Sequence, residues 1–301
     1  MVRDYEPGDA AALAALLRAN RPPELYVPTP AGLAHRLSHL PARARQRLWL
    51  VERDGAVVAA TRASFHWRAA EEGIGRVEVE VRRAWRRRGL GSDLLAIAEA
   101  YLAEAGARRI GCAVLGHADG LRFASRHGYE EIRRETFSWL EPRPVELDVS
   151  AGVRLLPLRS LLDRAEEVWR LETEATGDVP ADVPWLQIDF DEWVEETLDA
   201  PDLDLDGSVF AEVEGRLASY ALVSVDRDRG LAWNEMTGTA QAFRRRGLAR
   251  LVKLASIRCA ADAGIRAIST GNDDENAGML ALNRELGYRP LLESLELAKR
   301  L

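Results

Sequence analysis

The sequence predicts an α/β protein in which two consecutive copies of one domain each form a mixed sheet with helices packed on it. The first observation is an internal repeat. RRRGLG at residues 86–91 returns as RRRGLA at 244–249, and SRHGY at 125–129 returns as RELGY at 284–288. The second observation is length, since 301 residues suit two domains of ordinary size.

The order of elements is clearest in the second copy. A strand at 153–158 and helices at 161–173 and 190–198 precede a hairpin around Glu214 and Gly215, with strands at 209–213 and 217–225. A third strand follows at 231–239. Apolar residues at spacings of three and four predict a helix over 247–263, with Gly264 as its C-cap.

The copy then ends with a strand at 267–270, a helix at 276–286 and a last strand near 291–298. The same order in both copies indicates a mixed sheet. The segment 141–149 contains two prolines that discourage regular structure, so it is the natural join. We therefore divide the chain into domains 1–145 and 146–301.

Composition excludes several classes of protein. A chain with 47% hydrophobic and 30% charged residues is neither disordered nor fibrous. Its apolar stretches are too short to cross a bilayer and its first residues do not form a signal peptide, so we expect a cytoplasmic protein without a membrane partner. Cys112 and Cys259, far apart in sequence, predict neither a disulfide framework nor a zinc site, and we expect no metal.

Charge separates the two copies. Residues 1–143 carry a net charge of +5 and the remainder carries −12. The basic cluster at 82–88 could bind nucleic acid in isolation, but no nucleic-acid motif or aromatic interleaving accompanies it, so we expect no nucleic-acid partner.

Both RRRGL segments lie between a strand and the start of a long helix. The free amide groups and the positive end of the helix dipole favour an anion there, and glycine allows the backbone to approach it closely. Neither GxxxxGK[ST] nor a GxGxxG motif with its acidic partner is present. A charged helix start with glycine for packing remains the structural alternative.

The motif Arg-x-x-Gly-x-Gly/Ala at this junction, followed about 40 residues later by Gly-Tyr, resembles the pyrophosphate loop of the GNAT superfamily of acyl-CoA-dependent N-acyltransferases. The resemblance covers nearly the whole chain as two consecutive GNAT domains. It implies acetyl-CoA as co-substrate, with pantetheine between splayed central strands and the diphosphate on these loops. The residues it implicates are Arg86, Arg88, Gly89, Gly91, Arg244, Arg245, Arg246, Gly247, Leu248 and Ala249.

The third strand of the second copy, LAWNEMTGT, holds the predicted general base. Its residues Trp233, Glu235, Thr237 and Thr239 share one face if the two-residue period is unbroken. The resemblance implies that a carboxylate on this strand takes the proton from the amine, which selects Glu235, with Thr237 and Thr239 beside the cofactor. A solvated glutamate is the alternative, and a bulge, which Gly238 would permit, could shift the parity.

The first copy has Val77 at the matching offset, with Glu78 and Glu80 on the opposite face. We therefore expect the first domain to be degenerate and to lack the base, and the second to be catalytic.

Asparagines follow the next strand of the second copy. The resemblance implies that Asn276 touches the cofactor, with Asn272 as a weaker candidate, although both could be ordinary helix caps. The first copy has His117 at the matching position, and we expect this lone histidine to be a solvent-facing loop residue and not a catalyst. Many family members carry a tyrosine that protonates the leaving thiolate, where this sequence has Asn283 and Ala124. We assign no general acid, and Tyr220 and Tyr288 remain uncommitted.

Residues 177–206 hold eleven carboxylates, two tryptophans and neither Lys nor Arg. This stretch could bind a cationic acceptor through charge and cation–π contacts, or could be a solvated acidic segment with core tryptophans. The leading hypothesis is an N-acetyltransferase that acetylates a primary amine of a small acceptor and is a monomer or homodimer. Alternatives are a non-catalytic acyl-CoA sensor and an enzyme whose first copy is active.

Overall fold

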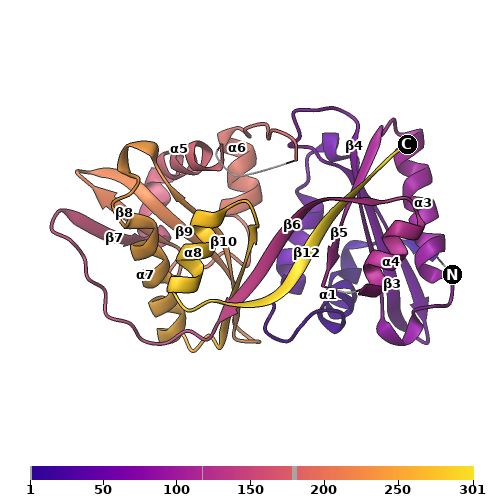
Figure 1. Cartoon of the computed structure of the whole chain (residues 1–301), viewed down its shortest axis with the longest axis horizontal. Coiled ribbons are helices and arrows are strands. Elements are labelled where there is room, and N and C mark those ends of the chain that lie inside the picture. Colours follow the sequence, from indigo (N-terminus) through magenta and orange to yellow (C-terminus); the bar gives the residue numbers. More distant parts are fainter. Residues whose placement is uncertain (1, 117, 178–181) are drawn as a thin grey trace.

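One continuous mixed sheet runs through both copies. The computed structural model describes residues 2–116, 118–177 and 182–301. Over these residues the sheet has twelve strands in the order β1-β2-β3-β4-β5-β12-β6-β11-β10-β9-β8-β7. Figure 1 shows the two halves side by side, with β6 and β12 crossing the middle. No helix in the described ranges is long and apolar enough to span a membrane.

The first copy has six strands and four α-helices within the described residues. Its strands are β1 (Val2–Asp4), β2 (Arg47–Arg53), β3 (Ala56–Phe65), β4 (Ile74–Val81), β5 (Arg109–Leu115) and β6 (Glu130–Leu140). Its helices are α1 (Ala10–Ala19), α2 (Pro30–Ser38), α3 (Leu90–Glu104) and α4 (Ala118–Arg126).

The second copy repeats this order. Its strands are β7 (Val153–Pro157), β8 (Val209–Val213), β9 (Arg216–Asp226), β10 (Leu231–Thr239), β11 (Ala267–Asp273) and β12 (Arg289–Arg300). Its α-helices are α5 (Ala165–Thr176), α6 (Phe190–Trp193), α7 (Leu248–Asp262) and α8 (Ala277–Glu285).

These elements confirm the predicted α/β class and differ from the predicted bounds mainly in the helices after β7. The helix expected at 161–173 is a 3₁₀ helix over Leu158–Arg164 followed by α5. The helix expected at 190–198 is α6 continued by a single π-helical turn over Val194–Leu198. The reason is packing, because Leu158 and Leu161 are both buried in the core beneath α5.

The last strands of the two copies are exchanged. Strand β6 ends the first copy in sequence but pairs with β11 of the second, and β12 pairs with β5 of the first. The two exchanged strands also pair with each other. The sequence boundary at residue 145 therefore separates two copies whose sheets are completed by each other, which ties them into one unit.

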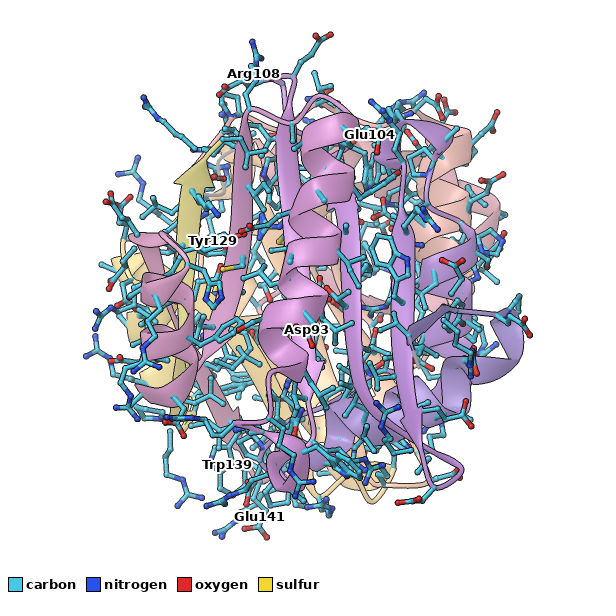
Figure 2. The ribbon with its side chains drawn as sticks, turned by 90° about the vertical axis from the view of Figure 1, so that its right-hand side faces the viewer. Asp93, Glu104, Arg108, Tyr129, Trp139 and Glu141 are labelled. Carbon is cyan, nitrogen blue, oxygen red and sulfur yellow. The ribbon has the colours of Figure 1, made fainter. Side chains whose placement is uncertain are left out.

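A long helix covers the central strands of each copy. In α3 the buried residues Leu94, Leu95, Ala98 and Leu102 recur at helical spacing, so one face of the helix packs on the sheet. Figure 2 shows α3 in front of the sheet and running along its strands, with Asp93 near its loop end and Glu104 near the other end. Helix α7 holds the same place in the second copy and packs on β9 and β10 through Val252 and Ile257.

The opposite charges of the two copies meet at their interface. Arginines of the first copy pair with carboxylates of the second, among them Arg18–Asp226 at 3.0 Å, Arg36–Glu235 at 2.8 Å, Arg43–Glu192 at 2.6 Å and Arg109–Asp182 at 2.8 Å. Much of the net charge difference therefore serves contact between the copies. Because most of these side chains are partly exposed, the pairs orient the copies more than they stabilise them.

Asp202 is a buried anchor between the copies. Its carboxylate, in a residue only 4% exposed, accepts hydrogen bonds from the Tyr26 hydroxyl at 2.6 Å and from the Thr29 amide at 2.9 Å, and also from the Thr29 hydroxyl. We expect Asp202→Ala to lower the free energy of unfolding by about 3 kcal/mol, because it leaves buried donors unpaired. Chemical denaturation measures this, with Asp206→Ala as the control. Asp206 pairs with Arg159 in solvent, so the control should change by less than about 1 kcal/mol. An equal loss in both variants would contradict the anchoring role.

Candidate functional site

The two RRRGL loops adopt the same backbone conformation. Arg87 and Gly89 have φ of 62° and 86°, and Arg245 and Gly247 have φ of 60° and 76°. These left-handed residues turn the chain so that it enters α3 or α7 with the first amides of the helix facing outward. Each loop therefore forms a helix start with free amides, as the sequence predicted, and anion binding there stays a prediction.

The arginines of the two loops also occupy matching places. The Nε of Arg86 donates to the Val81 carbonyl at 3.0 Å, and the Nε of Arg244 donates to the Thr239 carbonyl at 3.1 Å. Arg88 stacks on Trp85 at 4.8 Å and Arg246 stacks on Phe243 at 5.3 Å. These contacts hold the loops in shape, and the charges remain at the helix starts.

The central strands separate next to each loop. Strands β4 and β5 pair in parallel over three residues each, from Ile74 opposite Arg109 to Arg76 opposite Gly111. Strands β10 and β11 do the same, from Leu231 opposite Ala267 to Trp233 opposite Ser269. Beyond these pairs the two strands no longer pair with each other, and a gap runs between them toward the RRRGL loop. The structure therefore contains, twice, the gap between central strands that the family resemblance implies.

In the first copy this gap is an open, largely apolar cleft of about 410 Å³. It begins at the loop, beside Arg86, Gly89 and Gly91, and continues between the strands. Its inner walls are Val77, Leu95, Cys112, Val114, Ala124 and Tyr129. Burial raises the pKa of the Cys112 thiol to about 12, so this thiol stays protonated and acts as an apolar wall. An anion site that continues into an apolar slot fits the diphosphate and pantetheine of an acyl-CoA.

In the second copy the same positions are polar and bonded to one another. Leu95 is replaced by Lys253, which is 2% exposed and donates from Nζ to Asn234 Oδ1. Ala124 is replaced by Asn283, whose Nδ2 donates to Asn272 Oδ1 at 2.6 Å. These side chains stand at the positions whose counterparts, Leu95 and Ala124, line the open cleft of the first copy.

Lys253 is the most unusual of these groups. Its ammonium lies 5.2 Å from the centre of the Tyr288 ring, and no carboxylate pairs with it among the described residues. Burial lowers its pKa to about 7, so a large fraction of the amine is neutral near neutral pH. Lys253 is not among the residues predicted from the sequence, because the apolar stripe of the 247–263 helix does not include position 253.

The strand register corrects the sequence alignment of the two copies. Val77 and Asn234 each lie one residue beyond the last parallel pair, so Asn234, not Glu235, corresponds to Val77. The cause is a bulge between Asn234 and Met236, which adds one residue to β10 that β4 does not have.

In the antiparallel register Glu78 lies opposite Arg62 and Met236 lies opposite the matching Leu222, so Glu235 is the extra residue of β10 and has no strict counterpart in β4. That the first copy lacks the base stays a prediction, and Glu78 is its nearest carboxylate to the gap.

Both carboxylates stand two residues beyond the point where the strands separate. Glu78 pairs with Arg62 of the neighbouring strand. Burial by itself would raise the pKa of Glu78, but the Arg62 guanidinium holds it below its usual value, so this carboxylate is ionised at neutral pH. One oxygen of Glu235 accepts from Ser224 Oγ at 2.6 Å and from Arg36 at 2.8 Å.

The bulge also separates residues that were expected to share a face. Thr237 Oγ1 donates to Asn234 Oδ1 at 3.0 Å, the oxygen that Lys253 also contacts, so Thr237 lies on the α7 side of the sheet. The expectation that Thr237 and Thr239 lie beside Glu235 is therefore wrong. Thr239 instead shares a hydroxyl hydrogen bond with Ser219 at 2.8 Å. The bulge lies at Glu235 and not at Gly238.

Asn276 caps helix α8, since its Oδ1 accepts from the Met279 amide at 3.1 Å. Asn272 lies at the end of β11, bonded to Asn283. Their cofactor contacts stay predictions. His117 lies outside the described residues. Tyr288 is buried against Lys253, and Tyr220 is 1% exposed behind β10.

A gap between parallel strands, beside an anion-binding helix start, defines the site of an acyl-CoA-dependent acyltransferase. The family model described as "Acetyltransferase (GNAT) family" matches residues 13–129 and 164–288. The chain belongs to this family and carries two of its domains in tandem. Both matches stop before the exchanged strands β6 and β12. No curated protein sequence matches the chain.

Solved structures share the whole fold. A tandem GNAT protein from the clavulanic acid biosynthesis pathway has a TM-score of 0.79 at 21% identity, covering 100% of this chain and 98% of its own. A GCN5-related N-acetyltransferase from Sphaerobacter thermophilus has a TM-score of 0.73 at 18% identity, covering 100% and 95%. At such identities the likeness concerns the fold, including the tandem arrangement.

Proposed function

We propose that the protein transfers an acetyl group from acetyl-CoA to a primary amine of a small acceptor, and that the acetyl-CoA lies in the cleft of the first copy. The observation that carries this proposal is the difference between the two gaps. The first is a largely apolar slot of about 410 Å³ open to its loop, whereas the second has the polar side chains of Lys253 and Asn283 at the matching wall positions. A pantetheine arm needs the first kind of space.

The residues of the first copy have distinct roles in this proposal. The amides around Gly89 and Gly91 hold the diphosphate, and Val77, Leu95 and Val114 exclude water from the thioester. When bound, acetyl-CoA supplies the activated acyl group. Glu78, ionised at the edge of the gap, takes a proton from the acceptor's ammonium, directly or through a water. The neutral amine then attacks the thioester carbonyl, the carbon–sulfur bond breaks, and CoA leaves as its thiolate. Glu235, the base predicted from the sequence, is the matching candidate in the second copy.

The loops offer a matched pair of variants, because Gly91 and Ala249 hold the same position in the two copies. We expect Gly91→Val to weaken acetyl-CoA binding at least tenfold, since the added side chain enters the cleft where a Cβ already meets the Phe123 ring at 3.4 Å. Ala249→Val should leave the affinity unchanged. Isothermal titration calorimetry with acetyl-CoA measures both.

Three other outcomes are informative. Loss of binding in Ala249→Val alone places the cofactor in the second copy and contradicts the proposal. Retained binding in both variants contradicts a role for either loop. Tight binding without thiol release on any member of an amine library would favour the alternative function, a non-catalytic acyl-CoA sensor.

A further inference from the structure

Three arginines converge where the end of α1 meets the turn between β9 and β10. Arg18 lies in the last turn of α1, Arg229 lies in the β9–β10 turn, and Arg266 directly precedes β11. The side chain of Arg266 donates from Nε to the Arg229 carbonyl at 2.9 Å and from Nη2 to the Pro23 carbonyl of the first copy at 3.0 Å. We call these three arginines the arginine junction. It lies between the two copies.

One buried carboxylate faces the arginine junction. Asp226, which is 2% exposed, accepts from Arg18 Nη2 at 3.0 Å and from the Arg229 amide at 3.1 Å. The other carboxylate of the turn, Asp228, is exposed to solvent. With Asp226 included, the arginine junction therefore carries a net charge of +2.

The guanidinium of Arg229 lacks a partner. None of its side-chain nitrogens forms a hydrogen bond or an ion pair with the described residues, and its Nη1 is buried. Burial lowers the pKa of this guanidinium, and the positive charges of Arg18 and Arg266 lower it further, against the attraction of Asp226. The Nε of Arg18 is also buried without a hydrogen-bond partner. Unpaired donors and like charges at a partly buried interface are unfavourable, and a bound anion would satisfy both.

We propose that the arginine junction binds a phosphate dianion, as inorganic phosphate or as the phosphate group of a small phosphomonoester. Guanidinium groups bind phosphate oxygens through paired hydrogen bonds, and a phosphomonoester carries a charge of about −1.5 to −2 near neutral pH, which matches the junction. The phosphate oxygens accept from the free nitrogens of Arg229 and from Arg18 Nε. Because Arg229 is only partly buried, the ion reaches it from solvent.

This site is independent of the proposed function, because none of its residues lines the cleft of the first copy. It can therefore be tested on the wild-type protein without acetyl-CoA. At constant ionic strength, about 10 mM inorganic phosphate should raise the midpoint of thermal unfolding by about 2 °C or more, since a ligand of the folded state stabilises it. Acetate, a monoanion, should give less than half of this rise, and an equal rise would overturn the proposal. Glycerol 3-phosphate separates the two sources: a larger rise than with inorganic phosphate assigns the site to a phosphomonoester, and an equal or smaller rise assigns it to free phosphate.

Arg229→Met separates anion binding from a structural role. Without phosphate the variant should be at least as stable as the wild type, because it removes an unpaired charge beside two like charges. With phosphate its midpoint should rise less than half as much as that of the wild type. A variant that is destabilised by the same amount in both buffers would show a structural arginine and would overturn the proposal. Arg229→Gln should repeat the result, so one variant that fails to fold does not end the test.

Control variants locate the response to phosphate. Arg258 lies on the exposed side of α7, 3.9 Å from Asp262, and Arg258→Met should retain the full rise. Arg88→Met and Arg246→Met each remove a charge from one RRRGL loop, where phosphate could also bind, and should retain the rise as well. If the loop variants lose the rise and Arg229→Met keeps it, phosphate binds at the loops and the proposal is wrong.

Discussion

Lys253→Met is expected to raise the free energy of unfolding at pH 7 by about 3 kcal/mol. The lysine has a pKa of about 7 in the folded protein, against 10.5 as its ordinary value. Each pKa unit corresponds to about 1.4 kcal/mol, so burying Lys253 in its neutral form lowers the free energy of unfolding at pH 7 by about 4 kcal/mol. The hydrogen bond to Asn234 offsets about 1 kcal/mol of this loss. Methionine fills the same space without the charge.

The pH dependence identifies the cause. Between pH 7 and 10.5 the unfolded chain binds a proton on Lys253 that the folded chain does not, so wild-type stability from this group rises with pH. Lys253→Met should lose that rise, and its advantage should shrink toward pH 10. Urea denaturation of the wild type and of Lys253→Met at pH 7, 8, 9 and 10 measures this difference in the free energy of unfolding. The control is Lys299→Met, which removes the other lysine of the chain, one that is paired with Glu99 at 2.9 Å. A less stable Lys253→Met variant at pH 7 would show that Lys253 is charged and paired.

Glu78→Gln is expected to lower the rate of acetyl transfer by 100-fold or more while acetyl-CoA binding persists. A positioned general base contributes about 10² to 10⁴ in rate, and glutamine keeps the shape of the side chain but cannot accept the proton. Thiol release from acetyl-CoA, with an acceptor found by screening an amine library, measures the rate, and calorimetry measures the binding.

Glu235→Gln is the matched variant, since each of these two carboxylates stands two residues beyond the last parallel pair of its strands. If the first copy performs the chemistry, Glu235→Gln changes the rate only slightly, through its contact with Arg36. The reverse pattern, a slow Glu235→Gln and an unaffected Glu78→Gln, assigns the chemistry to the second copy, as the sequence first indicated. If neither variant is slowed, neither carboxylate is the base.

The predicted repeat, its element order and the place of both loops between a strand and a long helix agree with the structure because each depends on local pattern. Arg87, Gly89, Arg245 and Gly247 need only their neighbours to form a left-handed turn before a helix. The candidate base was harder to place. Counting residues from the loop aligned Glu235 with Val77, and the one-residue bulge in β10 became visible only through the pairing of β10 with β9.

The acidic segment illustrates the same limit. Its carboxylates suggested a cationic acceptor, yet Asp182, Glu192 and Asp202 contact the first copy. Net charge counts groups and carries no information about their partners. The unusual residue of the interior, Lys253, also gave no local signal of its burial, because burial depends on what packs over it.

The sequence by itself determined that this protein is one acyltransferase fold written twice, with a basic, glycine-containing loop before the long helix of each copy, since these features are encoded within short segments. The tertiary structure alone decided how the copies join and differ: the exchange of β6 and β12, the meeting of opposite charges, and the contrast between Leu95 beside an open cleft and the buried Lys253 at the matching position. The physical reason is that strand pairing and burial are set by contacts between residues more than a hundred positions apart.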